Sequence, residues 1–457
     1  MTPDVDAVIA GGGVAGSAAA AALAHLGWSV LIVEPGQHDE RRLAGELIHP
    51  AGVRRLAELG LLSAPAFAEA ARLAGFAIFP EAGSPSCIDL PYACPAPPPY
   101  ARPDPYRESA PPPPPGPTVA LALDHASICR SLLATVAARP AVTIARGWRV
   151  TSLQGTLREP IVQLHRAGVT ETVSARLVVA ADGASSPVRA YAGIAHRRIR
   201  NAVLTGYLVA EDALPRPGHG HIFTAAGGPV LAYAIGGQRA RVLFNGPFRD
   251  ATGARAGAQP RTDALTPPLR AAVEAAMAAS TGQRFVSSDV TVSGVSRGHV
   301  VLVGDAAGTC HPITASGMTM GTDDAIRLAQ ALRSRDGDVP AALALYAAER
   351  RSRQRARTLL AAMLHDALGG AGPEMGLLRA ALHRYWTGSA RARTTSMALL
   401  GMDDLGVGSI LIEFLRVAAS GLVVSLGEPH SILRRAGLMA RLSHPMMRHV
   451  LSTIRVR

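Results

Sequence analysis

This sequence contains no lysine and few cysteines and aromatic residues. Its 457 residues include no lysine, so all 46 basic side chains are arginine, and with 34 acidic residues the net charge is +12. Aromatic residues make up only 4% of the chain and no recognition motif for nucleic acid is present, so we expect no nucleic-acid partner. The excess of arginine, together with much alanine, glycine and proline, is typical of a GC-rich coding sequence. An anionic membrane surface or an acidic substrate is the alternative explanation of the charge.

The four cysteines, Cys87, Cys94, Cys129 and Cys310, include no C-x-x-C pair. This spacing predicts neither a metal site nor a thioredoxin-like motif, and so few thiols fit a reducing compartment. The apolar start Val5–Ala10 leads directly into glycines rather than into a signal-peptide cleavage site. We therefore expect a cytoplasmic protein without a resident metal.

The chain is 48% hydrophobic and 18% charged, which predicts a folded protein with a large core. Short apolar runs that end at glycine or aspartate predict strands at Val5–Ala10, Val30–Val33, Leu177–Ala181 and Val300–Val303. A helix is expected at Ser17–Leu26, closed by a glycine. The fold class predicted is α/β, with a Rossmann-like dinucleotide-binding domain, an inserted sheet-rich substrate domain and a helical C-terminal region.

The expected domain boundaries divide the chain into six stretches. The cofactor domain is expected in three parts, at 1–75, 119–195 and 296–365. The substrate domain is expected at 76–118 and 196–295, and the helical C-terminal region at 366–457. The first substrate stretch contains the whole segment 91–117, which holds 13 of the 34 prolines and predicts a stiff, extended excursion.

The first strand is followed by a glycine-rich turn that fits G-x-G-x-x-G, and Glu34 ends the next strand about 20 residues later. Glycines allow a backbone to approach a pyrophosphate, and the following helix presents its unpaired N–H groups. Glu34 can accept from ribose hydroxyls and disfavours a 2′-phosphate, so the dinucleotide should be FAD or NAD rather than NADP. The residues expected to hold it are Gly11, Gly13, Val14, Ala15 and Gly16.

Two further strand ends carry Asp182-Gly183 and Gly304-Asp305. Three such motifs in this order resemble the FAD-dependent monooxygenases with the p-hydroxybenzoate hydroxylase fold. The resemblance implies that Asp305 binds the ribityl chain of FAD. It also implies that Asp182 and Gly183 lie in the cleft that serves both FAD and the nicotinamide donor.

A closer resemblance, to the squalene epoxidases, rests on residues 42–61 and on the stretch that runs from His311 to Thr319. It implies that Arg42, Ala44 and Met318 contact FAD. In that family an arginine begins the helix expected near residue 125; Ser127 stands there instead, and Arg130 lies one turn on. The chain also has Ala315 and Ser316 where the epoxidases have two glycines, which puts squalene itself in doubt as the substrate.

The segment around Pro312, Gly317 and Met318 predicts a helix that starts after the proline. Its N–H groups would stabilise negative charge on reduced flavin. By resemblance, NAD(P)H reduces the flavin, directly or through a reductase, and reaction with O2 gives a flavin C4a-hydroperoxide. Transfer of one oxygen to an apolar alkene, such as an isoprenoid or polyene chain, is the activity expected, and it needs no base acting on the substrate.

Catalytic side chains are not predicted by any strong motif. Glu46 and His311 are the candidates, and His49 also flanks an expected flavin segment. Each histidine is equally compatible with a structural role, and Glu46 with a salt bridge.

Two C-terminal stretches combine apolar and basic residues. Leu405–Leu426 carries only Glu413 and Arg416 as charges, which favours a packed or interfacial helix over a membrane-spanning one. Ile432–Ile454 is typical of a membrane-surface helix, with a helical cap on the core as the alternative. The arginines of Ala341–Leu364 predict a solvated helix face. For the localisation we expect a cytoplasmic protein, with peripheral attachment to the inner face of a membrane as the open alternative.

Alternative activities remain open at this point. They are an aromatic hydroxylase of the same family and a flavin reductase that saturates prenyl double bonds. A flavin halogenase is disfavoured because those relatives rely on a lysine, and a carrier without activity is the remaining alternative.

Overall fold

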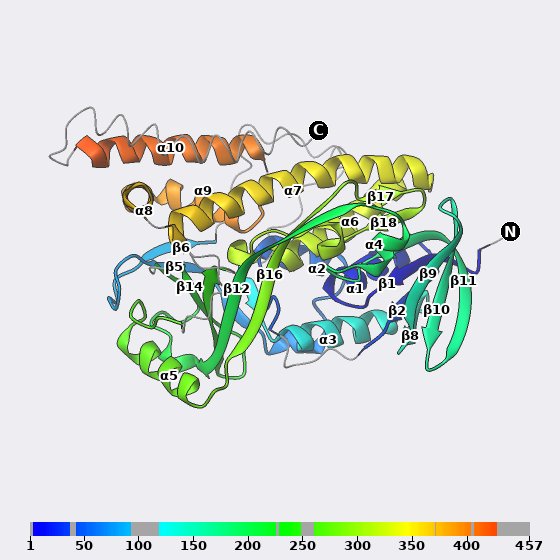
Figure 1. Ribbon diagram of the computed structural model, residues 1–457, viewed down its shortest axis with the longest axis horizontal. Helices are drawn as coiled ribbons and strands as arrows, with labels where there is room; N and C mark the ends of the chain where they lie inside the picture. The colour runs from blue at the N-terminus through cyan, green and yellow to red at the C-terminus, as the bar shows by residue number, and fades with distance from the viewer. Residues whose placement is uncertain are drawn as a thin grey trace.

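The computed structural model describes residues 3–36, 43–92, 118–224, 228–247, 260–370, 372–403 and 406–426. In these residues the chain forms two large sheets, a small sheet and a layer of C-terminal helices (Figure 1). The expected fold class is confirmed. Cys94, nearly all of the proline-rich excursion and the whole of Ile432–Ile454 lie outside the described residues.

The first sheet has a parallel centre, as a dinucleotide-binding domain requires. Its main path runs in the order β17 (Ser296–Arg297), β18 (Val300–Leu302), β11 (Val169–Ala180), β1 (Val5–Ala10), β2 (Val30–Glu34) and β8 (Val142–Arg146). The strands from β18 to β8 are parallel. An antiparallel extension, β9 (Arg149–Thr156) and β10 (Glu159–Arg166), pairs with the long β11. The three strands that end in functional motifs, β1, β11 and β18, are neighbours.

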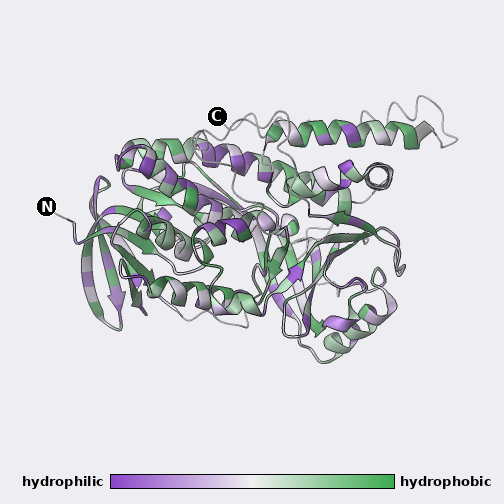
Figure 2. Ribbon diagram, turned by 180° about the vertical axis from the view of Figure 1, so that it is seen from behind, coloured by the Kyte–Doolittle hydropathy of each residue, from purple (hydrophilic) through white to green (hydrophobic). Residues whose placement is uncertain are grey.

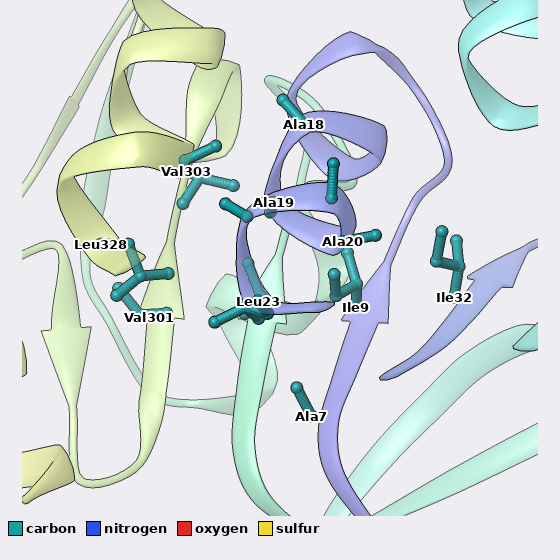
Figure 3. Close-up of a cluster of buried hydrophobic side chains, with 14 of the residues drawn as sticks. Ala7, Ile9, Ala18, Ala19, Ala20, Leu23, Ile32, Val301, Val303 and Leu328 are labelled. Atoms are coloured by element: carbon teal, nitrogen blue, oxygen red, sulfur yellow. The ribbon is translucent and has the colours of Figure 1, made fainter. Parts of the chain in front are cut away.

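Helix α1 (Val14–Ala24) packs closely on this sheet because it presents small side chains. Ala18 to Ala21 are fully buried, and Figure 3 shows Ala20 beside Ile9 of β1 and Ala19 near Val303, just after β18. The helix begins at Val14, three residues earlier than expected, because the glycine turn itself provides the N-cap at Gly13.

The second sheet is mixed and has seven strands. Their order is β16 (Gln283–Val292), β12 (His196–Ala210), β15 (Arg239–Pro247), β14 (Val230–Ala234), β13 (Gly220–Phe223), β5 (Gly75–Phe79) and β6 (Ile88–Pro91). A small sheet of β3 (Leu47–Ile48), β7 (Ala120–Ala122) and β4 (Ala71–Leu73) completes the strands. Segments from before residue 92 and after residue 195 thus share one sheet. The domain boundaries given above stay a prediction.

Helices cover both sheets. They are α2 (Pro50–Glu58), α3 (His125–Ala137), α4 (Pro187–Tyr191), α5 (Pro267–Ala278), α6 (Gly317–Ser334), α7 (Val339–Gly369), α8 (Pro373–Gly388), α9 (Ala390–Leu400) and α10 (Val407–Leu426). Helix α10 packs on α7, α8 and α9 and is hydrophobic along most of its length (Figure 2). Among the described helices, only its segment Val407–Val424 is long and apolar enough to cross a membrane.

The basic helix α7 differs from the expectation of a solvated face. Arg350, Arg353 and Arg357 are buried, whereas Arg351 and Arg355 are exposed. Arg350 and Arg353 pair with two adjacent carboxylates of α6. Arg357 instead donates to the hydroxyl of Ser316, just before α6, at 2.9 Å. The prediction failed because it counted the arginines without asking whether acidic partners lay on a facing helix.

Asp324 of α6 is the centre of this buried network. Its side chain and that of Arg350 are fully buried, with 2.8 Å between Arg350 Nε and a carboxylate oxygen. The carboxylate also accepts the backbone N–H of Gly304 at 2.9 Å. Asp324 therefore ties α6 and α7 to the end of β18.

The adjacent Asp323 gathers three further guanidinium groups, from Arg55 at 3.2 Å, from Arg327 at 3.0 Å and from Arg353. Burial alone would raise the pKa of Asp323, but these arginines hold it well below its usual range. The network thus also connects α2 to α6.

Replacing Asp324 should cost much of the stability of this protein. In Asp324→Asn the buried Arg350 loses its counter-charge, so we expect the free energy of unfolding to fall by about 3–5 kcal/mol, measured by urea unfolding. Asp263→Asn is the matched control, because Asp263 and its partner Arg261 have side chains 57% and 65% exposed and should contribute about 0–1 kcal/mol. Equal losses in the two variants would contradict the role given to Asp324.

Candidate cofactor site and its neighbours

The turn after β1 requires glycine for steric reasons. Gly11 has φ +97°, and a Cβ at Gly11 would lie 2.6 Å from the carbonyl oxygen of Ala181. A Cβ at Gly16 would lie 1.9 Å from the carbonyl oxygen of Gly11. Only glycine at both positions allows the turn to close against the end of β11.

Gly13 is different, because no described atom lies within 4 Å of the position its Cβ would take. It forms the N-cap of α1 without a side-chain cap, so no side chain of the N-cap satisfies the first N–H groups at the positive end of the helix. This is the arrangement that binds phosphate groups.

Glu34, at the end of β2, lies against the same turn. Its carboxylate accepts the N–H of Gly12 at 2.6 Å and that of Gly36 at 3.1 Å. The predicted ribose ligand and the predicted pyrophosphate turn are therefore adjacent.

The Gly304-Asp305 motif packs against this turn where three small residues, Ala15, Gly304 and Gly321, meet. A Cβ on Gly304 would lie 2.7 Å from the Cβ of Ala15, and one on Gly321 of α6 would lie 3.0 Å from it. Asp305 itself is exposed, with a carboxylate oxygen 3.8 Å from where Gly317 would carry a Cβ. The expected ribityl ligand thus lies at the N-terminus of α6.

The Asp182-Gly183 motif is fixed by a residue to which the sequence analysis gave no role. Arg189 of α4 is fully buried and donates to the carbonyl oxygens of Ala184 and Ala306, each at 2.9 Å. It thereby joins the residues that follow Asp182-Gly183 to those that follow Gly304-Asp305. The sequence shows an arginine seven residues after Asp182, but only the fold shows that its side chain connects two motifs.

Asp182 keeps one carboxylate oxygen without a partner. Oδ2 accepts the N–H of Val188 at 3.0 Å, whereas Oδ1 is buried and has no hydrogen-bond partner among the described residues. Burial raises the pKa of Asp182. An unsatisfied buried oxygen at a predicted cofactor cleft is a position where a ligand donor fits.

His49 joins the two epoxidase-like segments. Its Nε2–H donates to the carbonyl oxygen of Thr314 at 2.8 Å, so Nδ1 is the acceptor for the hydroxyl of Tyr92 at 2.6 Å. Its backbone N–H donates to Oγ1 of Thr319 at 3.2 Å. Complete burial lowers the pKa of His49 from its usual 6.5 to about 4, so the ring is neutral at pH 7.

The same two segments meet where flavin contacts were predicted. The side chain of Met318 approaches to 3.8 Å from the Cβ position of Gly45, and the neighbouring Ala44 is half-buried. Arg42 lies outside the described residues.

The loop before α6 differs in detail from the expectation. Pro312–Thr314 forms one 3₁₀ turn, and the α-helix begins only at Gly317. Ala315 between them has φ +48°, a left-handed conformation that favours glycine. The squalene epoxidases have glycine at the position of Ala315, and the backbone conformation of this chain there favours glycine.

Glu46, a catalytic candidate, lies in a buried ion pair. Its carboxylate accepts from Arg241 of β15 at 2.7 Å and from the Tyr233 hydroxyl at 3.4 Å. Burial raises the pKa of Glu46 and the pairing with Arg241 opposes this. The contact joins the segment 42–61 to the substrate sheet, and it agrees with the salt-bridge alternative given for Glu46. No described partner of Glu46 lies in the glycine turn.

His311, the other catalytic candidate, is also nearly buried. Its Nδ1 accepts the N–H of Ile313 at 3.3 Å, and its Nε2 lies 3.5 Å from the side-chain amide of Asn245. With Nδ1 as the acceptor, Nε2 carries the proton, so the amide oxygen of Asn245, otherwise without a partner, suits this contact better than the nitrogen. Burial lowers the pKa of His311 to about 4.

Arg130 lies on α3. Its side chain is exposed and donates to Ser127 on the same helix at 3.2 Å. The FAD contact expected for Arg130 stays a prediction.

Comparison with known proteins agrees with this geometry. A family model described as an FAD binding domain matches residues 4–361. The chain belongs to this family. It is 26% identical to the squalene monooxygenase of Eremothecium gossypii over 349 residues, 72% of this chain and 70% of the relative. It is also 26% identical to the squalene monooxygenase of Mus musculus over 418 residues, 87% of this chain and 68% of the relative.

Solved structures share the fold. A Klebsiella pneumoniae HpxO variant complexed with FAD aligns with a TM-score of 0.65 and 23% identity, over 89% of this chain and 99% of that one. The p-nitrophenol 4-monooxygenase of Pseudomonas putida aligns with a TM-score of 0.62 and 18% identity, over 90% of this chain and 98% of that one. The chain is thus an FAD-dependent monooxygenase of the p-hydroxybenzoate hydroxylase fold, as the sequence predicted.

The residues present fit FAD. The open space at Gly13 and the uncapped start of α1 suit the pyrophosphate, Glu34 suits the ribose, and Asp305 lies in place for the ribityl chain. Asp182, with its unpartnered oxygen, follows the end of β11, the strand between β1 and β18. These individual roles remain predictions.

The variant Gly13→Ala separates cofactor binding from folding. Its methyl group meets no described atom, so the melting temperature without FAD should not change, but it occupies the space expected for the pyrophosphate. We expect FAD affinity, measured by flavin fluorescence titration, to fall about tenfold or more. Gly376→Ala in α8, equally free of contacts, is the control, and unchanged FAD affinity in Gly13→Ala would show that the turn does not hold the cofactor.

The neutral, buried His49 predicts a pH dependence of stability. Between about pH 6.5 and pH 4 the unfolded chain binds a proton that native His49 does not, so the free energy of unfolding falls as the pH falls, by at most about 1.4 kcal/mol per pH unit. Urea unfolding of His49→Asn between pH 7 and pH 5 should show a shallower slope than the wild type. The exposed His383→Asn is the control; identical slopes in His49→Asn and the wild type would refute the buried neutral state.

Proposed function

We propose that this monooxygenase transfers one oxygen atom to a double bond of a long apolar alkene, such as an isoprenoid or polyene chain, to form an epoxide. The observation that carries the proposal is an apolar cavity beside the loop that precedes α6. Aliphatic side chains of the substrate sheet and of α7 to α10 form nearly all of its wall. The cavity has a volume of about 130 Å³.

The cavity adjoins the expected flavin loop. Ile313 of that loop lines the cavity directly. A smaller pocket beside it is lined by Thr314 and Ser316. The two pockets share four apolar lining residues: Leu360, Leu399, Leu400 and Ile410. A chain bound in the cavity therefore has an apolar path toward the loop.

The opposite end of the cavity adjoins a third, wider pocket. The two share Ile78, Leu368, Leu382 and Trp386, and the wider one is also lined by Val424 near the end of α10. On α10, Ile410 lies at the inner pocket and Val424 at the outer one, so the path extends over about 20 Å of helix at 1.5 Å per residue. Such a length favours a chain over a single ring.

The protein's part in this reaction is to bind, orient and exclude water, because reduced FAD supplies the activation of O2. The apolar side chains around Leu360 and Ile313 would hold the alkene in place. Arg357 is the charged residue of the smaller pocket, where its guanidinium donates to the hydroxyl of Ser316 at 2.9 Å. Attack on an unactivated alkene needs no base on the substrate, which agrees with the ion-paired Glu46. An aromatic hydroxylase, the second candidate, would need polar contacts around a phenol.

We extend the proposal to the electron donor and the membrane. NAD(P)H, directly or through a reductase, is the proposed source of electrons, since the similarity to squalene monooxygenases implies a nicotinamide donor. Helix α10 exposes Leu415, Leu422 and Val423, at 64%, 50% and 46% of their surface, near the outer pocket. This surface supports peripheral contact with a membrane, from which an apolar substrate would enter.

The test uses the FAD-loaded enzyme with NADPH, a reductase and ¹⁸O₂. Prenyl-chain alkenes should yield epoxides that carry one ¹⁸O, detected by mass spectrometry, while phenols remain unchanged. Hydroxylated phenols with untouched alkenes would identify an aromatic hydroxylase. A saturated product formed without O2 would identify a reductase.

Leu360→Trp should close the apolar path on the flavin side, because Leu360 lines both the cavity and the smaller pocket. We expect at least about tenfold less epoxide, while the release of hydrogen peroxide by the reduced enzyme continues. Ala348→Trp, at an exposed position of the same helix, is the control. Full epoxide formation in Leu360→Trp would place the substrate elsewhere.

A further inference from the structure

One carboxylate stands out in the wall of the apolar cavity described above. Only three of its lining residues are polar: Asp366, Ser396 and Glu413. Ser396 accepts a hydrogen bond from the indole of Trp386 at 3.0 Å, and Asp366 is partly exposed. Glu413 is 95% buried, since its exposed fraction is 5%.

The position of Glu413 on α10 directs it to the cavity. Ile410, Glu413, Phe414 and Val417 all line the cavity and have the spacing i, i+3, i+4 and i+7, which is one face of a helix. Ile410 also lines the small pocket beside the flavin loop. Glu413 therefore lies about 5 Å, one helical turn, farther along the path than Ile410.

Described partners use only part of the acceptor capacity of Glu413. One oxygen accepts from the hydroxyl of Tyr385 and the other from the guanidinium of Arg416. A carboxylate has about four acceptor sites, so two remain for a group inside the cavity. Arg416 already balances the charge, which favours a neutral donor over an ammonium group.

A purely mechanical role explains Glu413 poorly. Its ion-pair partner Arg416 lies on the same helix with a side chain 37% exposed, and the one described bond from Glu413 to α8 is with the hydroxyl of Tyr385. Apolar residues in place of buried charged groups are often neutral or stabilising, so packing α10 on α8 does not itself require a carboxylate. A substrate that contains only carbon and hydrogen would likewise have no use for an acceptor in this wall.

We propose that Glu413 accepts a hydrogen bond from a hydroxyl group of the substrate, so that the enzyme acts on a long-chain isoprenoid or polyene alcohol rather than on a pure hydrocarbon. The inference rests on the proposed function, because it takes the cavity as the substrate site. It adds that the hydroxyl lies one helical turn farther from the flavin loop than Ile410, away from the bond that is oxidised.

The test measures binding to the oxidised, FAD-loaded enzyme without a reductant, so no turnover occurs. The probes are geranylgeraniol and its methyl ether, which share the chain and the oxygen but differ in the O–H donor. Quenching of tryptophan fluorescence reports binding, because Trp386 lines the cavity. The wild type should bind the alcohol about tenfold more tightly than the ether, as a hydrogen bond to a charged group provides.

Glu413→Gln should reduce this preference to less than about threefold and leave the affinity for the ether unchanged. Tyr385→Phe removes a neighbour of Glu413 but keeps its carboxylate, so the preference should persist. Glu159→Gln, at an exposed position of β10, is the matched control. If Glu413→Gln does not fold, Glu413→Asp, which draws the carboxylate back from the cavity, is read in the same way.

Equal affinities for alcohol and ether in the wild type would overturn the inference, as would an equal loss of both affinities in Glu413→Gln. Failure to bind either probe would overturn it as well. Epoxidation of the ether without a preference for the alcohol would refute this inference alone. Tight binding of both probes without oxygenation of any alkene would instead refute the proposed function.

Discussion

The contact between the Asp324 carboxylate and the backbone N–H of Gly304 is the interaction on which the cofactor site depends. Gly304 begins the turn that follows β18 and precedes Asp305, so its position decides where the predicted ribityl ligand lies. Asp324 is itself fixed by the fully buried Arg350 of α7. The buried ion pair of Asp324 and Arg350 therefore fixes helices α6 and α7 relative to the segment after β18, next to the glycine turn.

Close approach of small residues completes this arrangement. Ala15, Gly304 and Gly321 come from three separated segments and leave no room for larger side chains between them. Ion pairing draws the segments together, and the absence of side chains lets their backbones meet. Both conditions are needed, because a guanidinium network without the small residues would hold the helices too far from the turn.

The apolar path toward the loop before α6 depends on a different part of the chain. Helices α8, α9 and α10 cover the substrate sheet and close a cavity that the dinucleotide-binding fold alone does not contain. Glu46 and Arg241 connect the first flavin segment to the same sheet. The cofactor domain and the proposed substrate cavity are thus mechanically joined, which suits a reaction in which an apolar chain must stay aligned while water is excluded.

The order of short-range patterns along the sequence determined the α/β class, the glycine turn and the three strand ends, because strand length, helix capping and the steric demands of glycine are local properties. Tertiary structure alone decided which arginines of α7 are buried, that Arg189 bridges two motifs, and that His49 joins Thr314 to Tyr92. These are pairings between residues far apart in the chain, and no spacing rule specifies the partner. The cavity was likewise decided by tertiary structure, since its wall combines side chains from one sheet, the loop before α6 and four helices. The sequence pattern does not contain the relative packing of these elements.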